Sequence, residues 1–117
     1  MTHYKFGDVV LVGFPFTNLQ TTKKRPAVVL SRESYNEQRP DIILMAISSR
    51  VREPLESGEA FVVDWQTAGL IKPSIFKPLI ATIEQDLVLN KLGVLNRIDQ
   101  EMLQQLLMSI LSFKVRD

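Results

Sequence analysis

The spacing of the apolar residues changes part-way along this chain, and that change restricts the folds open to it. Up to residue 83 the apolar residues come in short runs, several rich in β-branched side chains, separated by polar stretches. Runs of this length are typical of β-strands. They lie at 9–14, 26–31, 42–48, 61–63 and 75–83. The connections between them are too short to hold crossover helices, so we expect the strands to pair antiparallel.

The C-terminal segment has a helical period instead. Its apolar residues recur at 98, 102, 103, 106, 107, 110 and 111. This spacing predicts a terminal helix of about four turns, with Asp99 as N-cap and Ile98 packed against Leu103 as a hydrophobic staple. A shorter helix is expected from 85 to 92, ended by Gly93 in the left-handed conformation.

Short strands followed by a helix predict a fold that is mainly β with α. The expected form is a small barrel or curled sheet that carries the C-terminal helix. Pro78 interrupts the last strand, which indicates an edge or a bulge there. The chain has 117 residues and no linker-like stretch, so residues 1–117 are expected to form a single domain.

The composition excludes several classes of protein. Cysteine is absent, which excludes disulfides and thiolate metal sites. The sequence has no signal peptide pattern and no apolar run of the ~20 residues that a membrane helix needs. A cytoplasmic protein without a membrane partner is therefore expected.

The usual catalytic motifs are also missing. The sequence contains no glycine-rich phosphate loop, no metal-ligand spacing and no nucleophile elbow. His3 is the single histidine, so one chain cannot supply a pair of histidines for acid–base chemistry. No metal and no cofactor is expected.

Basic residues gather in two short clusters, although the net charge is only +1. One cluster is residues 23–25, and the other contains Arg50 and Arg52. A short basic cluster is often no more than a solvated turn. Its meaning here depends on whether folding brings the two clusters together.

Strand pairing gives a reason to expect that it does. If the second and third predicted strands pair antiparallel around their connection, Ser31 lies opposite Ile42. Counting outward, Arg25 then lies opposite Ser48. The two clusters and the hydroxyls of Ser48 and Ser49 would share one rim, where guanidinium and hydroxyl groups can bind phosphate. Two unconnected surface turns remain the alternative.

Several blocks of the sequence resemble the PemK/MazF toxins of type II toxin–antitoxin systems, in order and over nearly the whole chain. The blocks are GDVVLV (7–12), FPFTNL (14–19), KRPAVVLS (24–31), AISS (46–49), GLIKPS (69–74), ATI (81–83) and KLGVL (91–95).

The resemblance implies an SH3-like β-barrel that works as a homodimer. It also implies a sequence-selective endoribonuclease that cleaves single-stranded mRNA without a metal and is neutralised by a cognate antitoxin. In that chemistry the RNA 2′-hydroxyl attacks the adjacent phosphate. The family's arginine before proline matches Arg25, as charge stabiliser and proton donor to the leaving oxygen. The family's Ser or Thr after its second strand matches Ser48, as a hydrogen-bond donor to a non-bridging phosphate oxygen.

The polar segments beside these two positions are expected to contact RNA. The expected RNA-binding residues are Thr17, Asn18, Gln20, Thr21, Thr22, Lys23, Lys24, Ser49, Arg50 and Arg52.

The chain departs from the family pattern at two positions. Gln20 stands where active members often carry glutamate, and residues 77–79 stand where some carry aspartate. The sequence therefore shows no general base, since arginine is a poor one. Two alternatives stay open: a catalytically weak barrel that binds RNA or antitoxin, and a CcdB-like topoisomerase poison.

Overall fold

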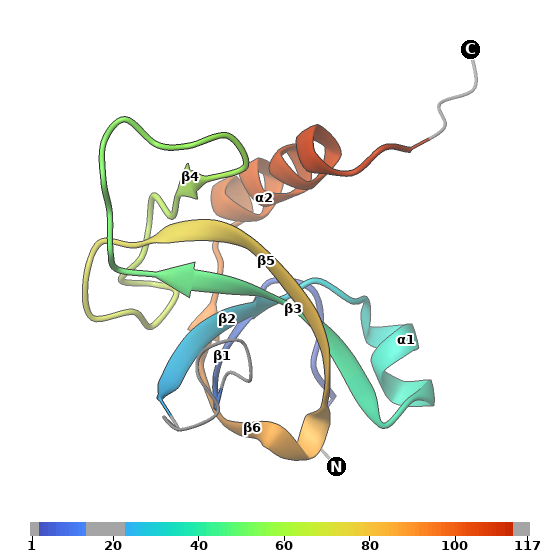
Figure 1. The fold of residues 1–117 in the computed structure, drawn as a ribbon. Helices are drawn as coiled ribbons and strands as arrows, with labels where there is room; N and C mark the ends of the chain where they lie inside the picture. The colour runs from blue at the N-terminus through green and yellow to red at the C-terminus, as the bar shows by residue number, and fades with distance from the viewer. Residues whose placement is uncertain (1–2, 14–22, 114–117) are drawn as a thin grey trace.

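The computed structural model describes residues 3–13 and 23–113, which form one curled antiparallel sheet and two helices (Figure 1). The elements in chain order are β1 (Asp8–Gly13), β2 (Lys24–Val29), α1 (Glu33–Gln38), β3 (Asp41–Ser48), β4 (Ala60–Phe61), β5 (Ile75–Glu84), the 3₁₀ turn η1 (Gln85–Leu87), β6 (Val88–Val94) and α2 (Arg97–Ile110). The prediction of a mainly β fold with a C-terminal helix is confirmed.

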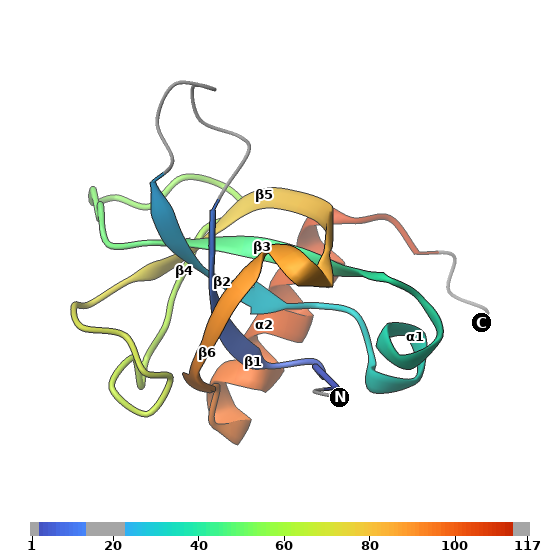
Figure 2. The same cartoon turned by 90° about the horizontal axis from the view of Figure 1, so that it is seen from below.

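The sheet has the order β4-β5-β3-β2-β1-β6, and every pair is antiparallel. Three residues of η1 connect β5 to β6, although three other strands separate these two in the sheet. The sheet must therefore curl strongly, as Figures 1 and 2 show. Its two edge strands are β4 and β6, so it is an open curled sheet and not a closed barrel.

The two faces of the sheet bury separate apolar clusters, because successive side chains of a strand point to opposite faces. Val9, Val28 and Met45 belong to the cluster that includes Leu103 of α2, which we call the helix-side core. Val12 and Ala27 belong to the cluster on the other face, the opposite-face core. Among the described residues, no helix is both long and apolar enough to span a bilayer.

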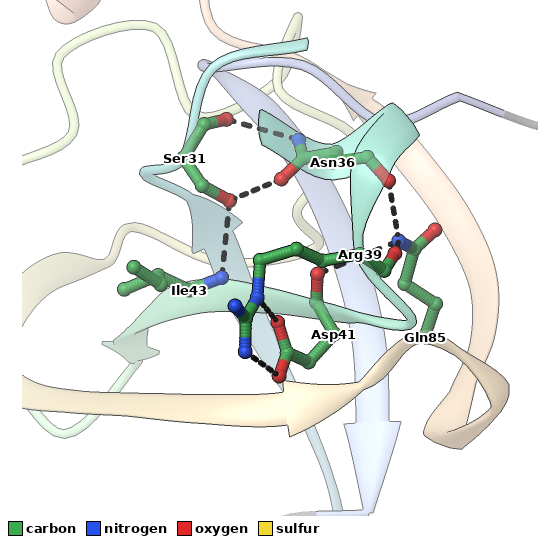
Figure 3. A network of polar contacts seen from close by, with 6 residues as sticks. All are labelled: Ser31, Asn36, Arg39, Asp41, Ile43 and Gln85. Carbon is green, nitrogen blue, oxygen red and sulfur yellow. Dashed lines mark hydrogen bonds and ion pairs between the residues drawn. The ribbon is translucent and has the colours of Figure 1, made fainter. Parts of the chain in front are cut away.

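A buried polar network fixes how β2 and β3 pair (Figure 3). The Ser31 hydroxyl donates to Asn36 Oδ1 and accepts from the Ile43 N–H at 3.0 Å. Asn36 Nδ2 donates to the carbonyls of Ser31 and Tyr4, at 3.0 and 2.7 Å. The Leu30 N–H donates to Ile43 O at 2.8 Å, so the network is continuous with the backbone hydrogen bonds between β2 and β3.

The observed register of β2 and β3 is the predicted one. Ala27 lies opposite Ala46, and Val29 lies opposite Leu44. The same count places Ser31 opposite Ile42, as predicted. The connection between the strands contains α1, a polar helix whose one buried residue is Asn36.

The prediction of a helix over 85–92 is wrong. Only η1 is helical, and the chain then continues as β6, which pairs with β1. Gln85 turns the chain at this corner: its side-chain amide donates to the carbonyls of Asn36 and Arg39, at 2.8 and 2.9 Å. A tertiary contact of this kind overrides a weak helical period.

Gly93 is not a left-handed helix terminator either, since it lies within β6 and is not among the glycines with positive φ. Its lack of a side chain serves a close contact. A Cβ on Gly93 would lie 2.7 Å from the Ala68 carbonyl oxygen, and a Cβ on Gly69 would lie 2.1 Å from the Leu92 carbonyl oxygen. Two backbone segments touch here, so both positions require glycine.

The terminal helix has the predicted length but begins earlier than expected. Its N-cap is Asn96, whose side chain accepts from the Asp99 N–H at 2.8 Å. Asp99 is buried and accepts from the N–H groups of Val63 and Asp64, both at 2.8 Å. Ile98 is 60% exposed, so the predicted staple against Leu103 does not form. The Asp99 carboxylate instead attaches the segment after β4 to α2.

β5 is continuous through Pro78, and its register against β3 shifts between Met45 and Ile47. The predicted irregularity at this proline is confirmed as a bulge.

Removal of the Asn36 side chain is predicted to destabilise the fold. Asn36→Ala leaves Ser31 and two backbone carbonyls without their partner, which we expect to cost about 2 kcal/mol. Denaturant unfolding measures this value. Glu37→Ala, at an exposed position of the same helix, is the control and should change the stability by less than about 0.5 kcal/mol. Equal losses in the two variants would mean that the network does not stabilise the strand pair.

Candidate functional site

The candidate site lies where β2 begins and β3 ends, at the opposite end of β3 from the Asn36 network. Arg25 lies opposite Val12 of β1, a member of the opposite-face core. It has the same strand parity as Ala27, another member of that core. The Arg25 side chain therefore lies on the face of this apolar cluster, at the end of the sheet.

A hollow of about 370 Å³ brings the two predicted clusters together. Its walls contain five cationic residues, three serines and four apolar residues, and no carboxylate among the described residues. The cationic residues are Lys23, Lys24, Arg25, Arg50 and Lys72; the serines are Ser48, Ser49 and Ser74; the apolar residues are Pro26, Ile47, Leu70 and Ile71. We call this the cationic hollow.

Arg25 and Ser48 both have unused donors. Arg25 Nε is buried and has no hydrogen-bond partner among the described residues. The Ser48 hydroxyl accepts from the Arg50 N–H at 3.1 Å, which leaves its own hydrogen available. The contact also forms a tight turn that directs the chain from Ser48 to Arg50. An anion in the hollow can accept from both residues.

Lys72 and Ser74 were missed as site residues by the sequence analysis. The Ser74 hydroxyl is buried and donates to the Lys72 carbonyl at 2.9 Å, while the Ser74 carbonyl accepts from the Val62 N–H. These bonds order the turn that carries Lys72. The signal was the pairing of β3 with β5, in which Ser48 lies opposite Ile75 and so next to Ser74. The register argument considered only β2 and β3.

Of the remaining predicted RNA-binding residues, Arg52 is described by the structure and does not line the cationic hollow. Arg52 lines a neighbouring hollow, which it shares with Arg50. Thr17, Asn18, Gln20, Thr21 and Thr22 lie outside the residues that the structure describes.

Two carboxyl groups with lowered pKa values serve the fold. Hydrogen bonding from the Arg39 guanidinium lowers the pKa of Asp41, at the start of β3. Hydrogen bonds from Thr67, and a weaker one from Asn96, lower the pKa of Asp64, beside the start of α2. Neither carboxyl lines the cationic hollow.

The hollow suits a phosphodiester better than a metal ion. Within 3–13 and 23–113 no group of three His, Cys, Asp or Glu side chains is placed to hold a metal. Guanidinium, ammonium and hydroxyl groups are donors that match phosphate oxygens. The apolar part of the wall offers a surface for the sugar or base beside such a phosphate; it consists of Pro26, Ile47, Leu70 and Ile71.

Solved structures share this fold at low sequence identity. An "endoribonuclease in complex with its cognate antitoxin" from a mycobacterial species has a TM-score of 0.76 at 12% identity, covering 97% of this chain and 99% of that chain. The Mycobacterium tuberculosis toxin MazF-mt6 has a TM-score of 0.74 at 19% identity, covering 92% and 99%. A MazE–MazF structure from Deinococcus radiodurans has a TM-score of 0.75 at 16% identity, covering 97% and 100%.

Comparison with curated proteins gives no match. The sequence profile described as "PemK-like, MazF-like toxin of type II toxin-antitoxin system" matches residues 5–111, which is nearly the whole chain. The chain therefore belongs to the family of PemK-like, MazF-like toxins of type II toxin–antitoxin systems.

Proposed function

We propose that this protein is an endoribonuclease toxin that cleaves single-stranded RNA and is neutralised by a cognate antitoxin. The observation that carries the proposal is the cationic hollow, in which Arg25 and Ser48 lie among three lysines and a second arginine, in a chain of this toxin family. Such a site binds phosphate and stabilises added negative charge on it.

In the proposed reaction the 2′-hydroxyl oxygen attacks the adjacent phosphorus. The bond from phosphorus to the 5′-oxygen breaks, which leaves a 2′,3′-cyclic phosphate and a 5′-hydroxyl. The intermediate phosphorane carries extra negative charge on its non-bridging oxygens, and preorganised donors stabilise that charge. Arg25 stabilises this charge and donates a proton to the leaving 5′-oxygen. Ser48 donates to a non-bridging oxygen.

The proton of the attacking hydroxyl passes to water in this scheme. No carboxylate lines the described part of the hollow, and residues 14–22 contain no acidic residue. A base positioned by the protein typically contributes 10²–10⁴-fold to a rate. We therefore expect slow turnover, and binding without cutting is the second candidate function that this same feature favours.

Loss of Arg25 is predicted to lower the rate of RNA cleavage by about a hundredfold or more, as deletion of one preorganised charge stabiliser does. Ser48→Ala should cost less, because it removes a neutral hydrogen bond. The measurement is cleavage of a long RNA in EDTA, where the unmodified protein should still cut. Arg97→Ala, on the exposed side of α2, is the control and should cut normally.

Full cleavage by Arg25→Ala, with its fold intact, contradicts the assigned role. A protein that binds RNA without cutting it supports the second candidate. One that neither binds nor cuts RNA supports a different target, as the CcdB-like alternative requires.

Binding to RNA is predicted to depend on salt through the lysines of the hollow. Each phosphate contact on a single strand adds a slope of about −0.7 to the plot of log affinity against log salt. Lys23→Ala with Lys24→Ala should flatten the slope by about one to two units, and Lys72→Ala by about one. The ligand is a single strand of 2′-deoxy sugars, which cannot be cleaved. Lys5→Ala is the control, because Lys5 precedes β1 and does not line the cationic hollow. Equal slopes in all the proteins would mean that the lysines of the hollow do not contact RNA phosphates.

The protein is also predicted to be a homodimer. Large apolar side chains stay exposed along α2 and just after it, among them Met102, Met108 and Leu111. Exposed apolar patches of this kind mark association surfaces. Sedimentation at micromolar concentration should give twice the chain mass of 13.3 kDa. A monomer at that concentration would contradict the prediction.

A further inference from the structure

A second hollow of about 310 Å³ adjoins the cationic hollow, and Arg50 lines both. Its walls come from the connection between β3 and β4 and from β5. They are formed by Arg50, Arg52, Pro54, Glu56, Glu59 and Lys77. We call it the mixed hollow, because it contains two carboxylates beside three cations.

The Glu59 carboxylate is held in place within the mixed hollow. Its Oε1 accepts from the Glu56 N–H at 3.0 Å, and its Oε2 lies 3.9 Å from Lys77 Nζ. The pairing of Ala60 with Phe76 keeps Glu59 beside Lys77. The Glu59 side chain is 10% exposed. The contact with Lys77 is long and Lys77 is partly exposed, so this ion pair contributes little and leaves Oε2 open to a better donor.

The two hollows suit different parts of one RNA strand. Carboxylates repel phosphate, so the mixed hollow does not suit the backbone. A nucleobase is neutral, and sequence-specific proteins bind the unstacked bases of single strands through their hydrogen-bonding edges. Because Arg50 belongs to both hollows, a base in the mixed hollow belongs to a nucleotide next to the phosphate in the cationic hollow.

The donors and acceptors of the mixed hollow select among the four bases. A carboxylate only accepts hydrogen bonds. Guanine alone presents two adjacent donors on its Watson–Crick edge, N1–H and the 2-amino group, and these match the two oxygens of Glu59. Adenine, cytosine and uracil each place an acceptor against one of those oxygens. Arginine side chains are common partners of guanine O6 and N7, and Arg50 and Arg52 lie in the same hollow.

We propose that the mixed hollow is a guanine-binding subsite, in which Glu59 reads the Watson–Crick edge of a guanine next to the scissile phosphate. The proposal rests on the proposed function and adds the base that the enzyme recognises. Glu59 and Arg52 are then specificity residues, whereas Arg25 and Ser48 act on the phosphate.

The test maps the 5′-hydroxyl ends that the protein generates in a long RNA of mixed sequence. The unmodified protein should cut at sites with guanine at one fixed position beside the cleaved bond. Glu59→Gln replaces one acceptor by a donor, and should lower the preference for guanine at that position at least tenfold while cutting continues. Glu101→Gln, in an exposed ion pair of α2, is the matched control and should keep the preference.

Inosine gives a second measurement that needs no variant. It lacks only the 2-amino group of guanine, so replacing that guanine by inosine should slow cleavage by the unmodified protein about tenfold. The same replacement should have little effect on Glu59→Gln. A cleavage pattern without a guanine position overturns the proposal. So does an unchanged preference in Glu59→Gln, or an inosine substrate cut as fast as guanine.

A failure of the proposed function is distinguishable from a failure of this subsite. If no RNA is cut, short 2′-deoxy strands that carry one guanine or one inosine are compared by affinity. Guanine bound at least tenfold more tightly, with the difference lost in Glu59→Gln, supports the subsite in a protein that does not cut. Equal affinities overturn it.

Discussion

The hydrogen bonds of Ser31 and Asn36 determine the register on which the site depends. They join α1 to the first residues of β3 and so set which residue of β2 faces which residue of β3. Because side chains alternate along a strand, a shift of one residue would move Arg25 from the face of Val12 to the other face of the sheet. The network and the cationic hollow lie at opposite ends of β3. A polar cluster with no part in the chemistry thus decides where the chemistry can occur.

The two hollows show how a chain with a net charge of +1 can still carry a strongly cationic surface. The cationic residues of the first hollow come from three separate segments, and no described carboxylate joins them there. The carboxylates of Glu56 and Glu59 line the mixed hollow instead, which shares Arg50 with the cationic hollow. The Ser48 hydroxyl accepts from the Arg50 N–H at this boundary, so the turn from β3 into the next segment also separates the two kinds of surface. The proposed preference for RNA thus rests on the local arrangement of charges and not on the overall charge.

Part of the fold could be predicted because the β2–β3 pair has no register shift, so that residues can be counted along both strands. The β2–β3 register followed from counting around one connection, and it brought residues 23–25 beside Ser48 correctly. The corner at Gln85 and the N-cap at Asn96 could not be predicted in the same way. Gln85 contacts carbonyls far away in the sequence, those of Asn36 and Arg39. Asp99, the expected N-cap, is instead held by the N–H groups of Val63 and Asp64, which are also distant in the sequence.

The same limit applies to the site. Arg25 and Ser48 lie on strands that follow each other in the sequence, and Arg50 comes two residues after the second of them, so counting along the strand pair identified all three. Lys72 comes from a segment that precedes β5 and joins the site through the pairing of β5 with β3, and β5 is distant in the sequence from β2. Nothing in the sequence pointed to Glu59 as a binding residue, because a single glutamate in a charged loop does not form a motif. Its fixed position becomes apparent only with the 3.0 Å bond to Glu56 and the neighbouring Lys77.

The contact of Gly69 with β6 has a consequence for how such a toxin loses its activity. Gly69 has a φ of +82° and its backbone lies against Leu92, so any side chain there would push the 69–74 segment away from β6. That segment carries Lys72 and Ser74 into the cationic hollow. In cells selected to survive expression of the toxin, disabling substitutions should therefore accumulate at this glycine as well as among the residues proposed to bind RNA. An active toxin would then depend on a position that does not itself line the cationic hollow.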